Sequence, residues 1–159
     1  MKGLIQLDTE EFLKLENQLC FAIYACSREI TRLYRPILDD LELTYPQFLT
    51  LAVLWEHQRL TVKEISQHLH LDSGTLTPML KRMEAMGLLE RKRASEDERK
   101  VYIELTNKGI NLKKKAIQLP EECIPHFGLS EHQYKELLAS MQQLIENLQQ
   151  VTRLTKEVN

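Results

Sequence analysis

The sequence predicts a mainly α-helical protein with one small β-hairpin, an α+β fold in which helices dominate. Apolar residues recur at steps of three and four over most of the chain, a spacing that is typical of amphipathic helices. The period changes to alternation only around residues 88–106, on either side of the polar segment ASEDER, which indicates two strands and a connecting loop. Cap residues such as Thr44, Thr61 and Ser130 precede helical stretches.

The first predicted helix spans 8–36, from a capping box at Asp8 to a stop at Pro36. A second helix begins at Thr44, with Pro46 in its first turn, and a third begins at Thr61. After a short turn, a fourth helix opens at Asp72 and ends at Gly87, which supplies a left-handed stop.

Beyond the hairpin, Thr106 leads into a further helix, and a stretch that holds Pro120, Pro125 and Gly128 interrupts the pattern. A capping box at Ser130 then opens a last long helix. Its residues Tyr134, Met141 and Leu148 stand seven apart, which forms a coiled-coil-like stripe. The stripe packs either within its own chain or in a two-fold dimer with a second copy, and the spacing alone leaves both open.

A helix, a turn, a second helix and a two-stranded hairpin form the winged helix-turn-helix arrangement. We expect this DNA-binding lobe at 44–106, in a single domain of 1–159 whose segments 8–36 and 107–159 serve dimerisation. In such lobes the second helix enters the major groove of double-stranded DNA, and a dimer reads an inverted repeat. The predicted contacts of that helix are Ser73, Gly74, Thr75, Thr77, Pro78, Lys81 and Arg82.

The overall charge does not indicate a nucleic-acid-binding protein, since the formal net charge is −2 and the pI about 6.2. Any DNA surface must therefore be local. Residues 81–100 hold seven basic and five acidic side chains, and Arg99, near the hairpin tip, is the candidate for the minor groove. The alternative is a solvated charged face without a partner.

Length and composition limit the class of protein, its location and the chemistry that it can carry out. The chain has 159 residues, no apolar run long enough for a membrane span and no apolar leader segment, so we expect a cytoplasmic protein without a membrane partner. Three cysteines make no disulfide framework. The five histidines show no ligand spacing, so we expect no metal, no cofactor and no catalytic residues, and hence no enzyme.

Two groups of motifs resemble known regulators. The stretches LTYPQFLTLAVLWEH and LDSGTLTPMLKRMEAMGLLERKRASEDERKVYIELTNKG resemble the MarR family of dimeric winged-helix regulators. ENQLCFAIYACSREI and LYRP resemble its OhrR-type branch, repressors that sense organic hydroperoxides. The resemblance implies that Asp97 orients Arg99 in the wing. It also implies that Cys20 is the peroxide-reactive thiol, that the partner subunit's Tyr34 and Tyr45 hydrogen-bond it, and that Tyr24 lines the site.

Sulfur chemistry agrees with that role for Cys20, since phenolic donors can favour a thiolate and a hydroperoxide converts a thiolate to a sulfenic acid. Taken alone, Cys20 would more often be an inert thiol. Cys26 faces away from Cys20 on the same helix and is expected in the core. Cys123 is either a resolving thiol, as in two-cysteine members of the branch, or a bystander in a protein that is capped by a small thiol instead.

The hypothesis is therefore a homodimeric repressor that releases an inverted-repeat operator when an organic hydroperoxide oxidises Cys20. Three alternatives stay open: a MarR-type repressor relieved by a small phenolic or hydrophobic ligand, a thiol peroxidase that uses Cys20, and a winged helix that contacts only proteins.

Overall fold

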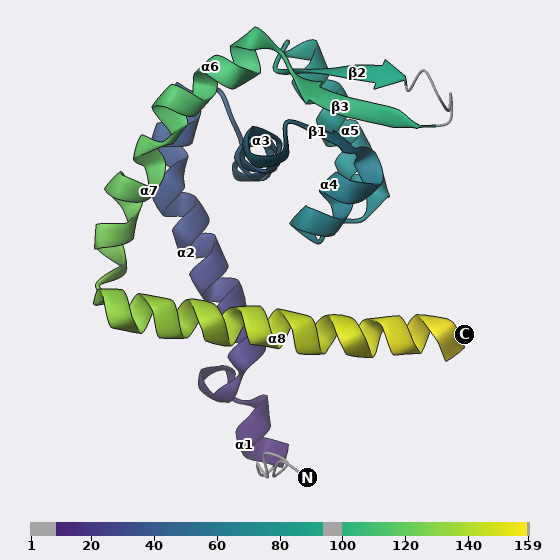
Figure 1. Cartoon of the computed structure of the whole chain (residues 1–159). Helices are drawn as coiled ribbons and strands as arrows, with labels where there is room; N and C mark the ends of the chain where they lie inside the picture. The colour runs from purple at the N-terminus through teal and green to yellow at the C-terminus, as the bar shows by residue number, and fades with distance from the viewer. Residues whose placement is uncertain (1–8, 94–99, 159) are drawn as a thin grey trace. The chain divides into compact units, whose positions relative to one another are not determined.

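The computed structural model describes residues 9–93 and 100–158, and the side chains of residues 10–93 and 100–152 (Figure 1). The chain divides into two compact units, 1–119 and 120–159, and each is described by itself. Asp8, Asp97 and Arg99, which the sequence assigned to the first cap and to the wing, lie outside the described residues.

Helices dominate the described residues, which confirms the predicted fold class. The first unit contains α1 (Thr9–Leu13), the 3-10 helix η1 (Leu15–Asn17), α2 (Leu19–Asp40), α3 (Tyr45–His57), β1 (Arg59–Thr61), α4 (Val62–Leu69), α5 (Ser73–Ala85), β2 (Leu89–Arg93), β3 (Val101–Leu105) and α6 (Asn107–Ala116). α7 (Gln118–Cys123) crosses into the second unit, where η2 (Ile124–Phe127) and α8 (Glu131–Val158) follow.

The hairpin belongs to a three-stranded antiparallel sheet in the order β1-β3-β2. Strands β2 and β3 were predicted, and β1 was not. Its three residues pair with β3 in the register Arg59↔Glu104, Leu60↔Ile103 and Thr61↔Tyr102. A three-residue strand is too short to show alternation, so the sequence carried no signal for it. Figure 1 shows α3, α4 and α5 beside this sheet, with β2 and β3 extending beyond them.

The core of the first unit lies between these three helices and the sheet. Its fully buried side chains come from α3, α4, α5 and the two long strands: Leu51, Leu54, Ile65, Leu76, Leu80, Met83, Leu89 and Ile103. α6 approaches the lobe closely at Gly109. A Cβ there would lie 2.1 Å from the carbonyl oxygen of Leu88, and the indole of Trp55 donates a hydrogen bond of 2.9 Å to the Gly109 carbonyl. Only glycine fits this contact.

The predicted helix caps are confirmed where the structure describes them. Gln47 accepts hydrogen bonds from the backbone and the hydroxyl of Thr44, and Glu64 does the same for Thr61. Gly87 has φ of 70° and follows the last turn of α5, where Leu88 N–H donates to the Met83 carbonyl at 3.0 Å. In the second unit, Ser130 and Gln133 form the predicted box before α8.

The first predicted helix is not continuous. It breaks at Lys14 and again at Gln18, where the backbone is extended with ψ of 129° and 109°, so that α2 begins at Leu19. Just before the second break, the amide of Asn17 donates to the backbone carbonyl of Glu11 at 2.9 Å. Asparagine side chains compete with helical backbone bonds in this way, which weakens the helix locally.

The predicted stop at Pro36 is wrong, because α2 continues through Pro36 to Asp40. Tyr34 and Leu38 are buried on either side of the proline, and their packing outweighs the backbone hydrogen bond that proline removes. The helix ends instead at Asp40, and Glu42, whose φ is 55°, turns the chain away so that Leu43 N–H donates to the Leu38 carbonyl at 2.9 Å.

Candidate functional site

Cys20 lies in the first turn of α2, as the second helical residue after Gln18. The sequence had placed it inside a longer helix, and the break at Gln18 changes its surroundings. The first N–H groups of a helix have no partner within the helix, and the helix dipole favours negative charge at this end. The Cys20 side chain is exposed in the single chain. An exposed thiol at a helix N-terminus is open to reagents from solution.

Tyr34 and Tyr45 meet in an aromatic cluster between α2 and α3. Their ring centroids are 5.4 Å apart in an edge-to-face arrangement, and Phe48 lies 6.4 Å from Tyr34 and 6.2 Å from Tyr45. Tyr34 is 9% exposed. The structure therefore brings together the two tyrosines that were predicted to share a site, although they come from different helices.

The same chain does not bring Cys20 to these tyrosines. Each helical residue advances about 1.5 Å, so the 14 steps from Cys20 to Tyr34 correspond to about 21 Å along the continuous helix α2. A hydrogen bond between the Cys20 thiol and Tyr34 therefore requires two copies of the chain. This distance agrees with the resemblance described above, which implies that the tyrosines next to Cys20 belong to the partner subunit.

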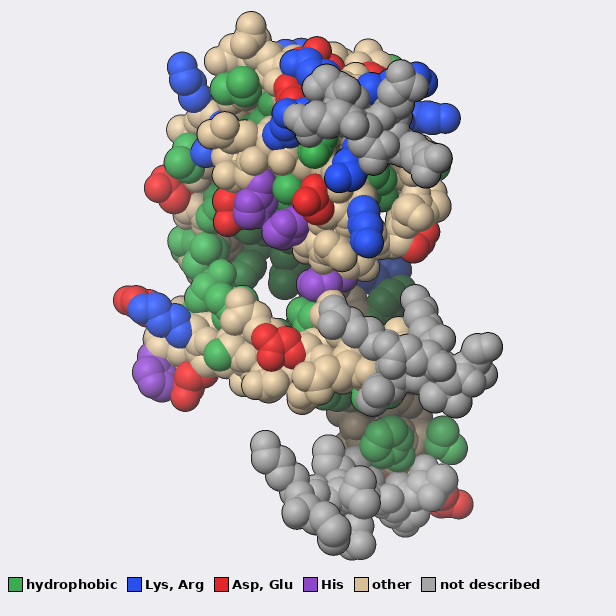
Figure 2. Space-filling model, turned by 45° about the vertical axis from the view of Figure 1, so that its right-hand side comes forward, with side chains coloured by type: hydrophobic (Ala, Val, Ile, Leu, Met, Phe, Trp, Pro, Cys, Tyr) green, Lys and Arg blue, Asp and Glu red, His purple; other side chains and the backbone are tan. Residues whose placement is uncertain are grey.

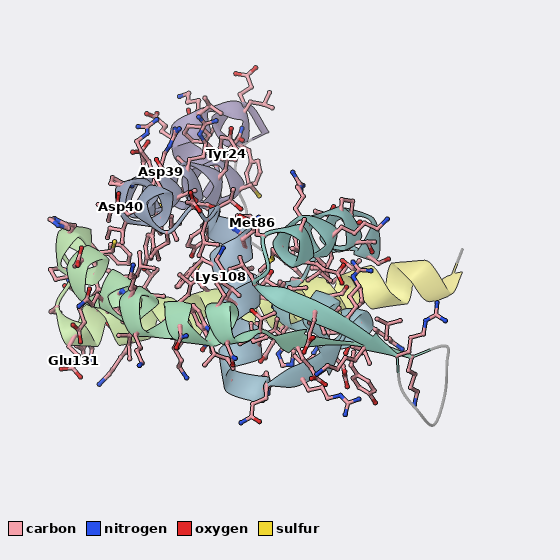
Figure 3. The ribbon with its side chains drawn as sticks, turned by 90° about the horizontal axis from the view of Figure 1, so that it is seen from above. Tyr24, Asp39, Asp40, Met86, Lys108 and Glu131 are labelled. Atoms are coloured by element: carbon pink, nitrogen blue, oxygen red, sulfur yellow. The ribbon has the colours of Figure 1, made fainter. Side chains whose placement is uncertain are left out.

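Tyr24 follows Cys20 by one turn of α2, and its side chain is 56% exposed (Figure 3). Its hydroxyl accepts a hydrogen bond of 2.9 Å from the guanidinium of Arg28, which also lies 5.6 Å from the centre of the ring. The sequence did not single out Arg28. Its position four residues after Tyr24 was the available signal.

The other two cysteines differ in exposure. Cys26 is exposed in the single chain, so its interpretation as a core residue is wrong here. Helical periodicity identifies an apolar face but does not show whether the same chain covers it. Cys123, at the end of α7, is 2% exposed, and burial raises the pKa of its thiol.

Helix α5 has one buried and one exposed face. Leu76, Met79, Leu80 and Met83 are buried, whereas the predicted DNA contacts Ser73, Gly74, Thr75, Pro78, Lys81 and Arg82 are exposed and Thr77 is half-buried. Small side chains thus occupy the start of the exposed face, and two cations follow one turn later. Such a face can approach a polyanion closely and then contact its phosphates.

Asp72 caps this helix. Its carboxylate accepts hydrogen bonds from the Thr75 N–H at 2.9 Å and from the Thr75 hydroxyl at 2.8 Å, and these bonds lower the pKa of Asp72. A Cβ on Gly74 would lie 2.9 Å from Asp72 Oδ1, so glycine leaves room for the carboxylate. The cap fixes where the exposed face of α5 begins.

The basic residues of the hairpin fall into two groups. Lys92 Nζ lies 2.8 Å from carboxylate oxygens of both Glu90 and Glu104, which raises the pKa of Lys92, and Arg91 Nε lies 3.2 Å from Glu84. Arg93 and Lys100 are exposed at the ends of the strands. Lys and Arg side chains gather around the hairpin end of the lobe in Figure 2. The local surplus expected from the sequence is therefore partly neutralised by carboxylates of the sheet and of α5.

A cavity of about 600 Å³ lies between α2 and the start of α3. Three arginines of α2 line it, together with one carboxylate and with hydroxyl and apolar side chains from both helices and the segment between them: Ser27, Arg28, Thr31, Arg32, Arg35, Leu38, Asp39, Leu43, Thr44, Tyr45 and Pro46. It adjoins the aromatic cluster through Tyr45. The described residues contain no group of three or more His, Cys, Asp or Glu side chains placed to hold a metal ion. In the described part of the chain, no helix has the length and apolar character that crossing a bilayer requires.

Comparisons with known proteins agree with this fold. A family model described as the transcriptional regulator SarA/Rot family matches residues 32–116. The organic hydroperoxide resistance transcriptional regulator of Bacillus subtilis (strain 168) is 53% identical over 140 residues, which cover 88% of this chain and 95% of that protein.

Two solved structures are similar over most of their length. Reduced AbfR bound to DNA, a protein of Staphylococcus epidermidis, is 34% identical with a TM-score of 0.76, over 91% of this chain and 99% of that one. A point mutant of Escherichia coli MarR, in complex with operator DNA, is 25% identical with a TM-score of 0.73, over 87% of this chain and 99% of that one. Taken together with the winged-helix lobe, these matches show that the chain belongs to the MarR-type winged-helix transcriptional regulators, in the group of the organic hydroperoxide resistance regulators.

Proposed function

We propose that the protein is a homodimeric, cytoplasmic transcriptional repressor that releases an inverted-repeat operator when an organic hydroperoxide oxidises Cys20. The observation that carries this proposal is the 53% identity to an organic hydroperoxide resistance regulator over nearly the whole of both chains. We infer a regulator rather than an enzyme, because a peroxidase would leave the exposed face of α5 and the wing without a role.

Dimerisation is supported by apolar side chains that the single chain leaves exposed. On α2 these are Leu19, Phe21, Ile23 and Tyr24, and on α8 they are Leu137, Leu138, Ile145, Leu148 and Val151. Exposed apolar patches of this kind are typical of interaction surfaces. A second copy that covers them would also allow Cys20 of one subunit to meet the tyrosines of the other.

The proposed chemistry is the first step of cysteine oxidation. The Cys20 thiolate attacks the terminal oxygen of the hydroperoxide, and the O–O bond breaks. The alkoxide leaves and takes up a proton to become the alcohol, while the sulfur becomes a sulfenate. Phenol groups near the sulfur would hydrogen-bond the thiolate and the developing negative charge. The new polar oxygen must then be accommodated among aromatic rings, which favours a different packing of α2 and α3.

DNA release then follows from a change in the recognition helices. A dimer presents two copies of α5, and their spacing must match one turn of the DNA. A tenfold loss of affinity corresponds to about 1.4 kcal/mol, so a modest rearrangement suffices. Asp97 and Arg99 of the wing are proposed to contact the minor groove in the same complex.

Cys123 is proposed not to resolve the sulfenic acid that forms at Cys20. Its burial and its raised pKa keep the thiol protonated, and a protonated thiol resolves a sulfenic acid slowly. Condensation of the sulfenate with a small thiol from solution is therefore favoured over a disulfide with Cys123.

The experiment measures operator affinity before and after treatment with cumene hydroperoxide, for the wild type, Cys20→Ser and Cys26→Ser. Cys26 is a matched control, because it is an exposed thiol on the same helix. We expect the wild type and Cys26→Ser to release DNA, and Cys20→Ser to stay bound. Release by Cys20→Ser at the wild-type peroxide concentration would refute the proposal.

The cavity beside Tyr45 favours a second candidate function, in which a small phenolic acid relieves repression. Its arginines could hold a carboxylate and its apolar residues a ring. A titration of the operator complex with 4-hydroxybenzoate in the absence of oxidant separates the two candidates. Release by the acid together with indifference to peroxide would favour the ligand-relieved repressor.

A further inference from the structure

The side chain of Gln47 caps α3 and also bonds a residue outside that helix. It is the third residue of α3, two positions after Tyr45, and it is buried at 8% exposure. Its amide oxygen accepts from the Thr44 N–H at 2.8 Å and from the Thr44 hydroxyl at 3.0 Å. These bonds hold the oxygen end of the side chain in the first turn of α3, so the amide nitrogen points away from that turn.

That amide nitrogen reaches the recognition helix. It donates to the sulfur of Met86 at 3.8 Å, across 39 residues of sequence. Met86 is the C-cap residue of α5. The contact therefore connects the helix that carries Tyr45 to the end of the helix that carries the predicted DNA contacts.

A second capping box in the same chain shows that this contact is not needed for capping. Glu64 accepts from the N–H and the hydroxyl of Thr61, both at 2.7 Å, as Gln47 does for Thr44. Glu64 is exposed and its side chain carries no N–H, so the side chain takes part in the capping box of α4 through its carboxylate oxygens alone. A buried position disfavours a carboxylate, and only an amide supplies both the acceptor for Thr44 and a donor for Met86.

The backbone of Met86 is also bonded to a residue of α6. The ammonium of Lys108, in the first turn of α6, donates to the Met86 carbonyl at 2.9 Å, and Figure 3 shows Lys108 beside Met86. The neighbouring Gly87 carbonyl accepts from the Thr106 hydroxyl at 2.6 Å. The end of α5 is thus tied to α3 through a side chain and to α6 through its backbone.

We propose that Gln47 is a positioning residue that transmits the state of the thiol–tyrosine site to α5 through Met86. The inference rests on the proposed function. Tyr45 is the first residue of α3, and its ring contacts Tyr34 and Phe48, so a change of packing around Tyr45 moves the first turn of that helix. Thr44 and Gln47 move with the turn because they are bonded to each other. Met86 then carries the displacement to the recognition helix.

The test compares the operator affinity of the reduced and the oxidised protein in matched variants, with a DNA duplex that the reduced wild type selects from random sequences. Met86→Leu keeps the volume and the Lys108 bond to the backbone but removes the sulfur acceptor. Met86→Gln restores an acceptor for the Gln47 amide. Met79→Leu makes the same chemical change at another buried position of α5 and is the control.

We expect all variants to bind the duplex when reduced and to form the Cys20 sulfenic acid at the wild-type rate by intact mass. Oxidation should lower the DNA affinity of the wild type, Met86→Gln and Met79→Leu by about tenfold or more. It should lower the DNA affinity of Met86→Leu by less than about threefold. If Met86→Leu binds too weakly when reduced, Met86→Ile replaces it, because isoleucine also lacks the sulfur acceptor and leaves the Lys108 bond to the backbone intact.

Two results would overturn the inference. One is a Met86→Leu protein that releases DNA on oxidation as fully as the wild type. The other is a Met79→Leu protein that loses the response to the same extent, which would show a general effect of altered packing. A wild type that does not respond to the oxidant refutes the proposed function itself, so the two failures are distinguishable.

Discussion

The rings of Tyr34 and Tyr45 meet edge to face, 5.4 Å between centroids, and so join the second half of α2 to the first turn of α3. Cys20 stands about 21 Å before Tyr34 on the same helix. The proposed sensing site is therefore divided: each chain carries the thiol at one place and the phenols at another. Two copies are needed to assemble it, which ties the chemistry of the site to the dimer.

Mixed dimers test this division. One subunit carries Cys20→Ser and the other carries Tyr34→Phe with Tyr45→Phe, so the remaining thiol faces intact tyrosines only if the site forms between subunits. We expect that thiol to be oxidised by cumene hydroperoxide at least about tenfold faster than in a homodimer of the tyrosine variant. Intact mass distinguishes the two chains. Equal rates in the mixed dimer and the tyrosine-variant homodimer would show that the partner's tyrosines do not serve Cys20.

The two groups of hairpin cations predict different salt dependences of DNA binding. Arg93→Ala should reduce the slope of log K against log salt concentration by about one, because an exposed cation that contacts a phosphate releases a counterion. Lys92→Ala should change the slope less, since Lys92 already pairs with Glu90 and Glu104. Fluorescence anisotropy at several salt concentrations measures both slopes. A larger change for Lys92→Ala would contradict this assignment of the wing surface.

The Asp72 cap predicts a pH dependence of stability. Hydrogen bonds from Thr75 lower the pKa of Asp72 in the folded protein, below its ordinary value of about 3.9. The contribution of the charged carboxylate to stability is therefore complete above that ordinary value and is lost as the pH falls through the lower folded pKa. Asp72→Asn keeps an acceptor but cannot titrate.

Thermal unfolding of the wild type and Asp72→Asn, followed by circular dichroism from about pH 6 downward, measures this contribution. We expect the wild type to have a higher Tm than Asp72→Asn. The difference in Tm between the two proteins should be constant above about pH 4.5 and should shrink below about pH 4. A difference that stays constant down to about pH 2.5 would mean that the charge of Asp72 does not strengthen the cap.

Cys123 should react more slowly than the other two cysteines. Its side chain is buried and its thiol pKa is raised, whereas Cys20 and Cys26 are exposed. Brief treatment of the native, reduced protein with iodoacetamide, followed by peptide mass analysis, should find Cys123 labelled last. Labelling of Cys123 ahead of Cys20 would favour a resolving role for it.

Local signals in the sequence were sufficient for much of the fold. Thr44, Thr61 and Gly87 act through bonds to residues close in the chain, so their roles could be predicted without knowledge of tertiary structure. The alternation of residues 101–105 likewise depends only on which face of the strand is buried.

The differences arose where distant packing or competing bonds decided the outcome. Pro36 stands inside α2 because Tyr34 and Leu38 are buried around it, and no local rule contains that information. Next to the break at Gln18, the Asn17 amide bonds the backbone six residues earlier, a contact that helical periodicity does not predict. The bond between Gln47 and Met86 spans 39 residues, so only the folded chain reveals it.

The candidate site was predictable in its residue types but not in its assembly. The resemblance indicated Cys20, Tyr34 and Tyr45, and the structure brings the two tyrosines together. The exposure of Cys26 was missed, because the periodicity of an apolar face does not reveal which chain covers it.

The most direct test of the central claim follows the modification of Cys20 and the loss of DNA in one sample. Substoichiometric cumene hydroperoxide is added to the operator complex, fluorescence anisotropy gives the fraction of DNA released, and intact and peptide mass give the fraction of Cys20 that has gained oxygen or a small-thiol adduct. We predict that the two fractions rise together at each addition. Release while Cys20 is unmodified, or full modification of Cys20 with the DNA still bound, would contradict the account.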